Sequence, residues 1–434
     1  MDKMADVLGR VGAWCGQNKY LSAIKNAFQN FMPLTIAGAI GVLWCNVLVN
    51  ESTGLGIFFK PIMALDFLNP AFQAVNFCTI SCITVGITLG IAQEIGVWNM
   101  GAEKAGYIPG LVGLAAWLSV TNTSHMVEGA KEAFTGIAGN ELGATGLFTG
   151  MIISVLSVEL FCFFEKQDAL KIKMPEQVPP GVARAFEVLV PATITLIITA
   201  CIGSACYNLT GLYLNDVIKN GIQGPLGAVG ATIPGVMIIY LVIMLFWLVG
   251  IHGNNMLSAV KEALFTPLAL ENVEKFNKGE KPTNIINMYA LQMWGEFGGS
   301  GVTIGLVIAI MIFGKREDNK AIATLSLVPG LFNINETVTF GIPMVLNPIL
   351  GIPFVFACLV TILVGYVLTV IGFCPVACLT VPWTTPPIVF GFLATGANVM
   401  GAVTQAILIV VSTVIYVPFL IAYEKYQNKQ AAEA

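Results

Sequence analysis

Long stretches of the chain contain no Asp, Glu, Lys or Arg and are strongly apolar. A helix needs about 20 consecutive apolar residues to cross the hydrocarbon core of a bilayer. In the first part of the chain this rule predicts six spans: Phe31–Val49, Ala71–Gln93, Tyr107–Val120, Thr145–Phe164, Phe186–Tyr207 and Ile233–Ile251. The pattern therefore predicts an all-α polytopic membrane protein.

The later part of the chain is apolar but repeatedly interrupted. After the apolar stretch Phe297–Gly314 comes a basic cluster, Lys315–Lys320, and beyond it Glu336 is the only charged residue before Glu424. Many Pro and Gly residues fall in this region, and broken or re-entrant helices survive at membrane depth only when buried in protein or lining a cavity. We expect about ten spans in all plus re-entrant hairpins, with full spans here over Ile349–Phe373, part of Pro375–Thr395 and Gly401–Tyr423.

Basic residues indicate how the chain is oriented. They gather between Lys3 and Lys25, between Lys166 and Arg184, and between Lys261 and Lys281. Cytoplasmic loops of membrane proteins carry an excess of Lys and Arg. With a cytoplasmic N-terminus, all three clusters face the cytoplasm, and Lys425 and Lys429 indicate a cytoplasmic C-terminus. The second and third clusters would also suit the docking of an acidic partner by charge attraction.

A Pro-rich segment between Glu165 and Arg184 divides the chain. We expect an N-terminal membrane half with its cytoplasmic linker over residues 1–185, a fifth span and external loop over 186–225, and a second half with re-entrant hairpins over 226–434. The Lys315–Lys320 cluster falls outside the cytoplasm if the stretch before it spans simply, so either that stretch re-enters or the charge rule is broken here.

Composition narrows the function classes. Hydrophobic residues make up 56% of the 434 residues and charged residues only 11%, against roughly 25% charged in soluble domains. A soluble enzyme, a disordered chain and a nucleic-acid-binding domain are therefore excluded. The ten Cys residues form no CxxC pair and there is no HExxH, GxSxG or EF-hand pattern, so we expect neither a metal site nor a cofactor.

Glu336 is the first candidate for chemistry, because an ionisable group inside a membrane is functional by default and marks a polar cavity or partner. It lies among Asn333, Asn335, Thr337 and Thr339, whose side chains compete for backbone hydrogen bonds. We expect a carboxylate sheltered in a ligand chamber beside amide groups. The alternative is a carboxylate buried against helix termini as a packing device.

His252 is the second candidate. It lies in the run Gly250–Asn255, where the flanking glycines allow the backbone to break and approach a ligand. An imidazole offers a donor and an acceptor on one rigid ring. The alternative is an interfacial histidine that caps a helix C-terminus.

Three tryptophans could supply a flat apolar face for a sugar ring: Trp247, Trp294 and Trp383. The alternative is an interfacial anchor, which is what we expect of Trp44, Trp98 and Trp117. The Gly-rich run Trp294–Gly301 matches no Walker or Rossmann pattern. We interpret it as a place of close backbone packing, with direct phosphate binding as the alternative.

These motifs resemble a known family. The run Asn333–Glu336, followed by Phe340–Pro343 and Val345–Pro348, resembles the motif of the sugar-transporting IIC component of the bacterial phosphotransferase system, in its lactose, cellobiose and chitobiose branch. The run Gly250–Asn255 resembles the second motif of the same family. The resemblance extends from Lys19 to about Glu424, and Thr337 stands where the family has Pro.

The resemblance implies an architecture and a set of sugar ligands. An N-terminal half would form a homodimer, with its interface in residues 186–225. The C-terminal half would carry a disaccharide and two re-entrant hairpins, and would move by alternating access. His252 and Glu336 would hydrogen-bond the sugar, and Asn254 and Asn335 would be further ligands.

The resemblance also implies partners. A phosphocysteine on a separate IIB protein would phosphorylate the 6-hydroxyl, which Glu336 would polarise, with phosphoryl groups arriving through HPr and a IIA protein. The chain would be the permease component in the bacterial cell membrane, without a cofactor. The residues leave open which disaccharide is carried, and a proton- or sodium-coupled symporter with Glu336 as the coupling carboxylate is the alternative function.

Overall fold

The computed structural model describes residues 14, 17–51, 56, 59–125, 134–175, 177–225, 230–342, 344 and 347–433. Some residues named above, including Lys3, Pro343 and Val345, lie outside the described residues. The described part falls into two compact units. Unit 2 comprises the described residues between 17 and 38 and between 75 and 227. Unit 1 comprises residue 14, the described residues between 39 and 74, and those from 228 onward.

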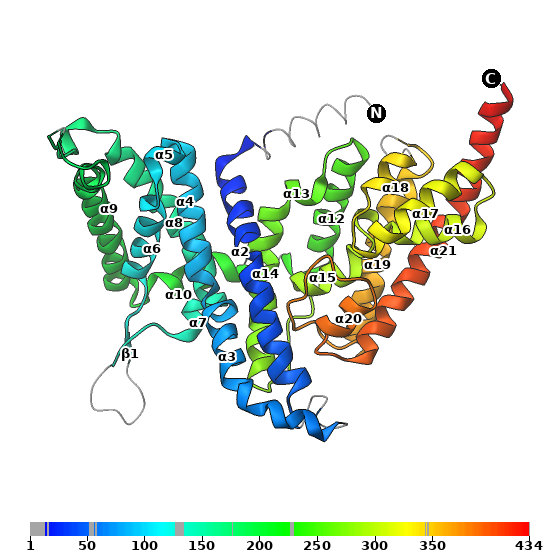
Figure 1. The fold of residues 1–434 in the computed structure, drawn as a ribbon, viewed down its shortest axis with the longest axis horizontal. Coiled ribbons are helices and arrows are strands. Elements are labelled where there is room, and N and C mark those ends of the chain that lie inside the picture. Colours follow the sequence, from blue (N-terminus) through cyan, green and yellow to red (C-terminus); the bar gives the residue numbers. More distant parts are fainter. Residues whose placement is uncertain are drawn as a thin grey trace. The chain divides into compact units, whose positions relative to one another are not determined.

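The core of unit 2 is a group of apolar helices. Helices α4 (Ile83–Met100), α6 (Ile108–Val120) and α8 (Ala144–Glu165) pack on one another, and α9 (Pro180–Thr210) lies against α6 and α8 (Figure 1). Close approach depends on small residues: a Cβ added at Gly113 would lie 2.3 Å from Ala92 Cβ. Trp117 of α6 is completely buried in this core, so its predicted role as an interfacial anchor is wrong.

The remaining elements of unit 2 are the first part of one long helix and several short helices and strands. Helix α2 (Lys19–Leu43) begins in it, and α5 (Ala102–Ala105), α7 (Gly139–Leu142) and α10 (Leu214–Ile218) connect the longer helices. Strands β1 (Ser124–His125) and β2 (Phe134–Thr135) pair antiparallel, with Ser124 opposite Thr135. This small hairpin lies in a stretch too polar and too short to cross a membrane, and the sequence pattern gives no sign of it.

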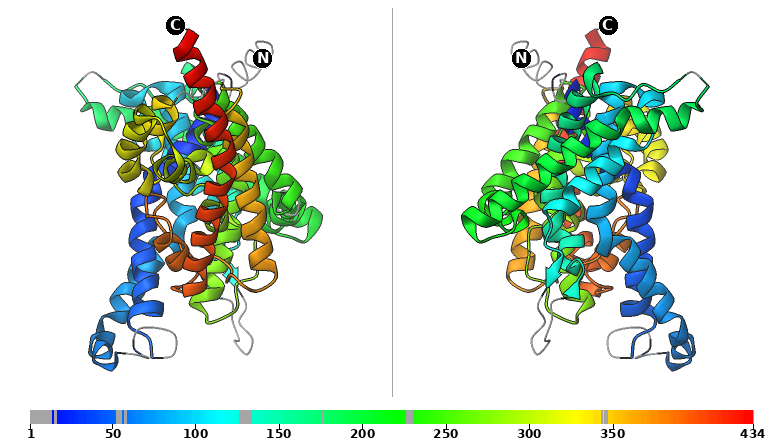
Figure 2. Two further views of the ribbon diagram at one scale, coloured as in Figure 1. Left: turned by 90° about the vertical axis from the view of Figure 1, so that its right-hand side faces the viewer. Right: turned by 90° about the vertical axis from the view of Figure 1, so that its left-hand side faces the viewer.

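Unit 1 is built from broken and continuous helices. After α3 (Asn69–Cys78), which begins in it, the helices are α12 (Ile233–Leu248), α13 (Gly253–Met256), α14 (Ser258–Asn277), α15 (Met288–Gly295), α16 (Ile304–Phe313), α17 (Glu317–Leu331), α18 (Glu336–Gly341), α19 (Gly351–Val370), α20 (Val389–Ala394) and α21 (Val399–Glu433). The long helices α19 and α21 run side by side, and α16 packs against α21 (Figure 2).

The apolar stretches form helices, as the sequence predicts. Among the described residues six helices are long and apolar enough to cross a membrane: Lys19–Leu48, Lys60–Met100, Ala144–Glu165, Pro180–Thr210, Gly351–Val370 and Val399–Ala432. A seventh candidate is the pair Met288–Val302 and Ile304–Phe313, bent by 59°, and Ile108–Val120 and Ile233–Leu248 are shorter apolar helices. The predicted all-α polytopic membrane class is confirmed, while the total of ten spans and the two hairpins stay predictions.

One predicted span and two predicted boundaries can be compared with the described helices and units. Pro375–Thr395 was expected to contribute a span, but its only described helix is the six-residue α20. Its prolines lack the N–H groups that a helix needs. The predicted boundary at residue 185 lies inside unit 2, whereas the predicted start of the last part at 226, itself outside the described residues, lies close to the change to unit 1 at residue 228.

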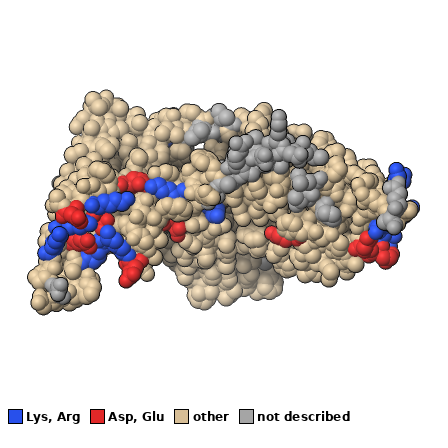
Figure 3. Space-filling view, turned by 90° about the horizontal axis from the view of Figure 1, so that it is seen from above, with Lys and Arg blue, Asp and Glu red and all other residues tan. Residues whose placement is uncertain are grey.

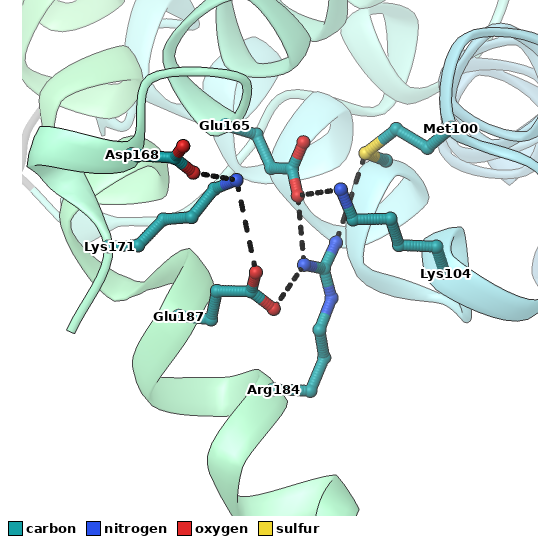
Figure 4. A network of polar contacts seen from close by, with 7 residues as sticks. All are labelled: Met100, Lys104, Glu165, Asp168, Lys171, Arg184 and Glu187. Atoms are coloured by element: carbon teal, nitrogen blue, oxygen red, sulfur yellow. Dashed lines mark hydrogen bonds and ion pairs between the residues drawn. The ribbon is translucent and has the colours of Figure 1, made fainter. Parts of the chain in front are cut away.

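Charged side chains are sparse in the view of Figure 3, and where they gather the two signs are intermixed. A network of this mixed kind holds the linker of unit 2 (Figure 4). Glu165 Oε1 accepts from Arg184 Nη1 and pairs with Lys104 Nζ, both at 2.9 Å, and Arg184 also donates to Glu187 at 2.7 Å. The network therefore ties the end of α8 to α5 and to the start of α9.

The outer part of this network is exposed. Lys171 Nζ lies 3.1 Å from Asp168 Oδ1 and reaches towards Glu187 at 4.0 Å. The hydrogen bond from Lys171, with its positive charge, lowers the pKa of the Asp168 carboxyl. Asp168 is largely exposed, with 81% of its side chain accessible, whereas only 1% of the Glu165 side chain is.

Removing Arg184 should therefore destabilise unit 2. Arg184→Gln leaves the buried Glu165 with only the half-exposed Lys104 as a cationic partner, and breaking a buried pair costs on the order of 3 kcal/mol. We expect a clear drop in the thermal unfolding temperature of the purified protein. Asp168→Asn is the matched control, because exposed pairs contribute about 0–1 kcal/mol. Equal unfolding temperatures for both variants would contradict this account.

Candidate functional site

A tight loop in unit 1 brings the sequence motifs together. It connects α15 to α16 through Glu296–Thr303, and Gly298, Gly299 and Gly301 all have positive φ angles of 67°, 88° and 75°. Such angles suit glycine, which has no Cβ. The loop therefore bends sharply and allows its neighbours to approach its backbone, as the sequence interpretation of close packing expects.

Ser300 in this loop joins the two polar segments that are predicted to bind ligand. Asn254 Nδ2 donates to Ser300 Oγ at 3.1 Å, and Asn335 Nδ2 donates to the Ser300 carbonyl at 2.8 Å. Both Ser300 and Asn335 are buried. Asn254 Oδ1 is buried and has no hydrogen-bond partner among the described residues, so it is an acceptor that a ligand hydroxyl could satisfy.

Asn333 fixes a second segment to the same loop. Its Oδ1 accepts from the Gly298 N–H at 2.6 Å, and its Nδ2 donates to the carbonyls of Trp383 and Thr385. Asn333 itself has a positive φ of 63°, a conformation that Asn tolerates better than most residues. Its amide thus connects the loop with the Pro-rich segment that carries the exposed Trp383.

His252 is oriented by its own helix and by an aromatic neighbour. It is the N-cap of α13, where its Nδ1 accepts from the Asn255 N–H at 3.3 Å, so the alternative of a C-terminal cap is wrong. Its ring lies against Trp247, with centroids 4.4 Å apart. In the neutral ring, Nδ1 as acceptor makes Nε2 the N–H donor, and Nε2 is the nitrogen left for a ligand.

Glu336 lies at the start of α18, with its side chain exposed rather than sheltered. This exposure disagrees with the alternative of a carboxylate buried against helix termini, while the ligand chamber stays a prediction. The segment that carries this carboxylate meets the His252 segment at Ser300, through the side chains of Asn335 and Asn254. An anionic acceptor and an N–H donor, carried on two segments that meet at one loop, can together hold hydroxyl groups of one ligand.

The three candidate tryptophans differ in accessibility. Trp294 is 1% exposed and packs against α19, where a Cβ added at Gly365 would lie 2.3 Å from the indole. We therefore assign Trp294 to packing. Trp247 is also buried and serves as the support for His252, whereas Trp383 is 45% exposed and free to contact a ligand.

An ion pair that the sequence pattern does not predict lies at the start of the loop that connects α15 to α16, between the buried Lys261 and the partly buried Glu296. Glu296 Oε1 pairs with Lys261 Nζ and accepts from Tyr240 OH at 2.7 Å. The sequence does contain an indication of this pair. Glu296 is the only charged residue between Lys281 and Lys315, just as Glu336 is the only one between Lys320 and Glu424. Among the described residues, no group of three or more His, Cys, Asp or Glu side chains is placed to hold a metal ion.

Comparison with known proteins identifies the family. The family model described as phosphotransferase system, EIIC, matches residues 25–358. The chain belongs to this family. The predicted resemblance is thereby confirmed, and the chain is a multi-pass bacterial membrane protein of the EIIC type.

Several relatives match over nearly their whole length. The chain is 33% identical to the oligo-beta-mannoside-specific EIIC component of Bacillus subtilis (strain 168), over 98% of this chain and 94% of that one. It is 29% identical to the cellobiose-specific EIIC component of Lactococcus lactis subsp. lactis (strain IL1403), over 98% of each. The crystal structure of ChbC, the IIC component of the N,N'-diacetylchitobiose-specific phosphotransferase system, superposes with a TM-score of 0.88 at 30% identity, over 98% of each chain.

Proposed function

We propose that this EIIC protein carries a β-linked disaccharide of the cellobiose, chitobiose or lactose type into the cell for phosphorylation. The observation that carries the proposal is that the His252 and Glu336 segments meet at one loop through Ser300. The specificities named for the relatives support a disaccharide, since they include oligo-β-mannoside, cellobiose and N,N'-diacetylchitobiose.

The proposed ligands follow from donor and acceptor chemistry. The Glu336 carboxylate accepts hydrogen bonds from sugar hydroxyls, and His252 Nε2 donates one. Asn254 supplies its unpaired Oδ1, and Asn335 aligns the start of α18 through Ser300. Trp383 offers the flat apolar face that packs against the C–H face of a pyranose.

The proposed reaction uses a separate IIB protein as the phosphoryl donor. The phosphorus–sulfur bond of its phosphocysteine breaks as a bond forms between phosphorus and the sugar O6, and the O6 proton leaves towards the Glu336 carboxylate. HPr and a IIA protein recharge IIB. We further propose alternating access for transport, cytoplasmic N- and C-termini, and a homodimer with residues 186–225 at its interface.

Analysis of the internalised sugar tests this function. In cells that express the chain with its IIA, IIB and HPr partners, radiolabelled cellobiose, diacetylchitobiose and lactose are offered in turn. We expect one of them to be recovered inside as its 6-phosphate, and deletion of IIB to abolish this product. Recovery of unmodified sugar, with uptake lost when the proton or sodium gradient is dissipated, would instead identify a symporter.

A further inference from the structure

The buried Lys261 and the partly buried Glu296 form an ion pair at the start of the loop that joins the proposed ligand segments. Lys261 is 5% exposed, and Tyr240 is completely buried. The Glu296 carboxylate receives both donors on the same oxygen, Oε1. Burying two charges is costly, and replacing such a pair with apolar residues is often neutral for stability. Stability alone therefore gives a weak reason for its presence.

Position in the chain suggests another reason. Glu296 is the first residue after α15, and the loop that follows contains Gly298, which holds Asn333, and Ser300, which holds Asn254 and Asn335. The far end of the loop is held independently, because Tyr416 OH donates to the Gly301 carbonyl at 2.8 Å. The ion pair thus fixes the near end of the loop, and Tyr416 fixes the far end.

We infer that the Tyr240–Glu296–Lys261 cluster is a positioning device that sets the loop, and through Ser300 the ligand segments, in the geometry that binds sugar. This inference rests on the proposed function. Lys261 lies on α14 and Tyr240 on α12, so the cluster ties the loop to the two helices that flank the His252 segment.

Binding to the purified full-length protein separates positioning from stability. The probes are cellobiose, N,N'-diacetylchitobiose, β-1,4-mannobiose and lactose, and the sugar that binds wild type most tightly by calorimetry is used for the variants. Lys261→Met/Glu296→Gln removes both charges without leaving one unpaired. We expect its unfolding temperature to stay near that of wild type, while its Kd rises about tenfold. Glu165→Gln, which removes a buried paired carboxylate in unit 2, should leave the Kd unchanged.

A double-mutant cycle tests whether the cluster acts through Ser300. Groups that act through one another show non-additive effects, whereas independent groups add. Ser300→Ala alone should raise the Kd about tenfold, and the same change added to the neutralised pair should raise it less than about threefold further. Multiplication of the two effects, or an unchanged Kd for the neutralised pair, would overturn the inference.

Two further results separate a failure to fold, and a failure of the proposed function, from a failure of the positioning role. If the neutralised variant does not fold, Tyr240→Phe removes only the hydroxyl that donates to Glu296, and it should raise the Kd several-fold; an unchanged Kd would count against the cluster. If wild type binds none of the four disaccharides, the proposed function fails and the positioning role fails with it. If wild type binds sugar and the variants have the same Kd, the positioning role alone is contradicted.

Discussion

Glu336→Gln should lower the affinity for the transported disaccharide by about 10- to 100-fold, because a hydrogen bond to a charged group contributes about 1.5–3 kcal/mol. The amide keeps the size of the side chain but loses the negative charge and one acceptor oxygen. Since Glu336 is exposed and has no ion-pair partner among the described residues, folding should be little affected. Calorimetric binding and uptake of labelled sugar measure the effect.

His252→Ala should give a loss of similar size, since it removes the donor at Nε2 and the ring that rests on Trp247. His252→Gln should restore part of the affinity, because its amide N–H₂ can donate where Nε2 did. Glu317→Gln is the matched control: that carboxylate is 86% exposed and pairs with Lys320. Near-normal uptake by both Glu336→Gln and His252→Ala would remove these residues from the site.

Gly299→Ala should disturb the site through backbone geometry alone. Gly299 has φ 88° and ψ −178°, a region that is essentially restricted to Gly, and other residues there cost about 1–3 kcal/mol. An added Cβ would lie 2.5 Å from Asn335 Cγ and 2.6 Å from Asn335 Cβ. Either the loop or Asn335 must shift, so we expect sugar affinity to fall by about tenfold or more and the unfolding temperature to drop.

Gly279→Ala separates strain from collision. Gly279 also has a positive φ, of 72°, but an added Cβ there would meet nothing within 4 Å. We expect this control to lose some stability and no sugar affinity. If both alanine variants bind sugar as wild type does, close contact between the loop and Asn335 is not needed for binding.

The sequence pattern is informative wherever one physical cause dominates. Charge-free apolar stretches have to be helical inside a bilayer, and the predicted span Thr145–Phe164 lies within the observed α8, Ala144–Glu165. The pattern fails for Pro375–Thr395, because its apolar side chains favour a membrane span whereas its prolines disfavour a continuous helix. It also fails for Trp117, because amphipathic Trp favours interfaces on average while burial depends on which helices meet around it.

The sequence predicts individual residues of the candidate site but not which of them meet in three dimensions. Solitary polar groups in apolar sequence drew attention to Glu336 and His252, and the same rule applied to Glu296 would have found it. Pairing is different, since Lys261 and Glu296 are 35 residues apart. Which partners meet depends on how helices pack in three dimensions, and so does the exposure of the Glu336 side chain.

Ser300 has a consequence for transport. Because its hydroxyl and carbonyl bind two chain segments some 80 residues apart in sequence, those segments cannot separate without breaking a buried hydrogen bond. A sugar bound by both segments would therefore stay in a site of constant geometry during transport. The conformational changes that admit and release it would have to occur elsewhere in the protein.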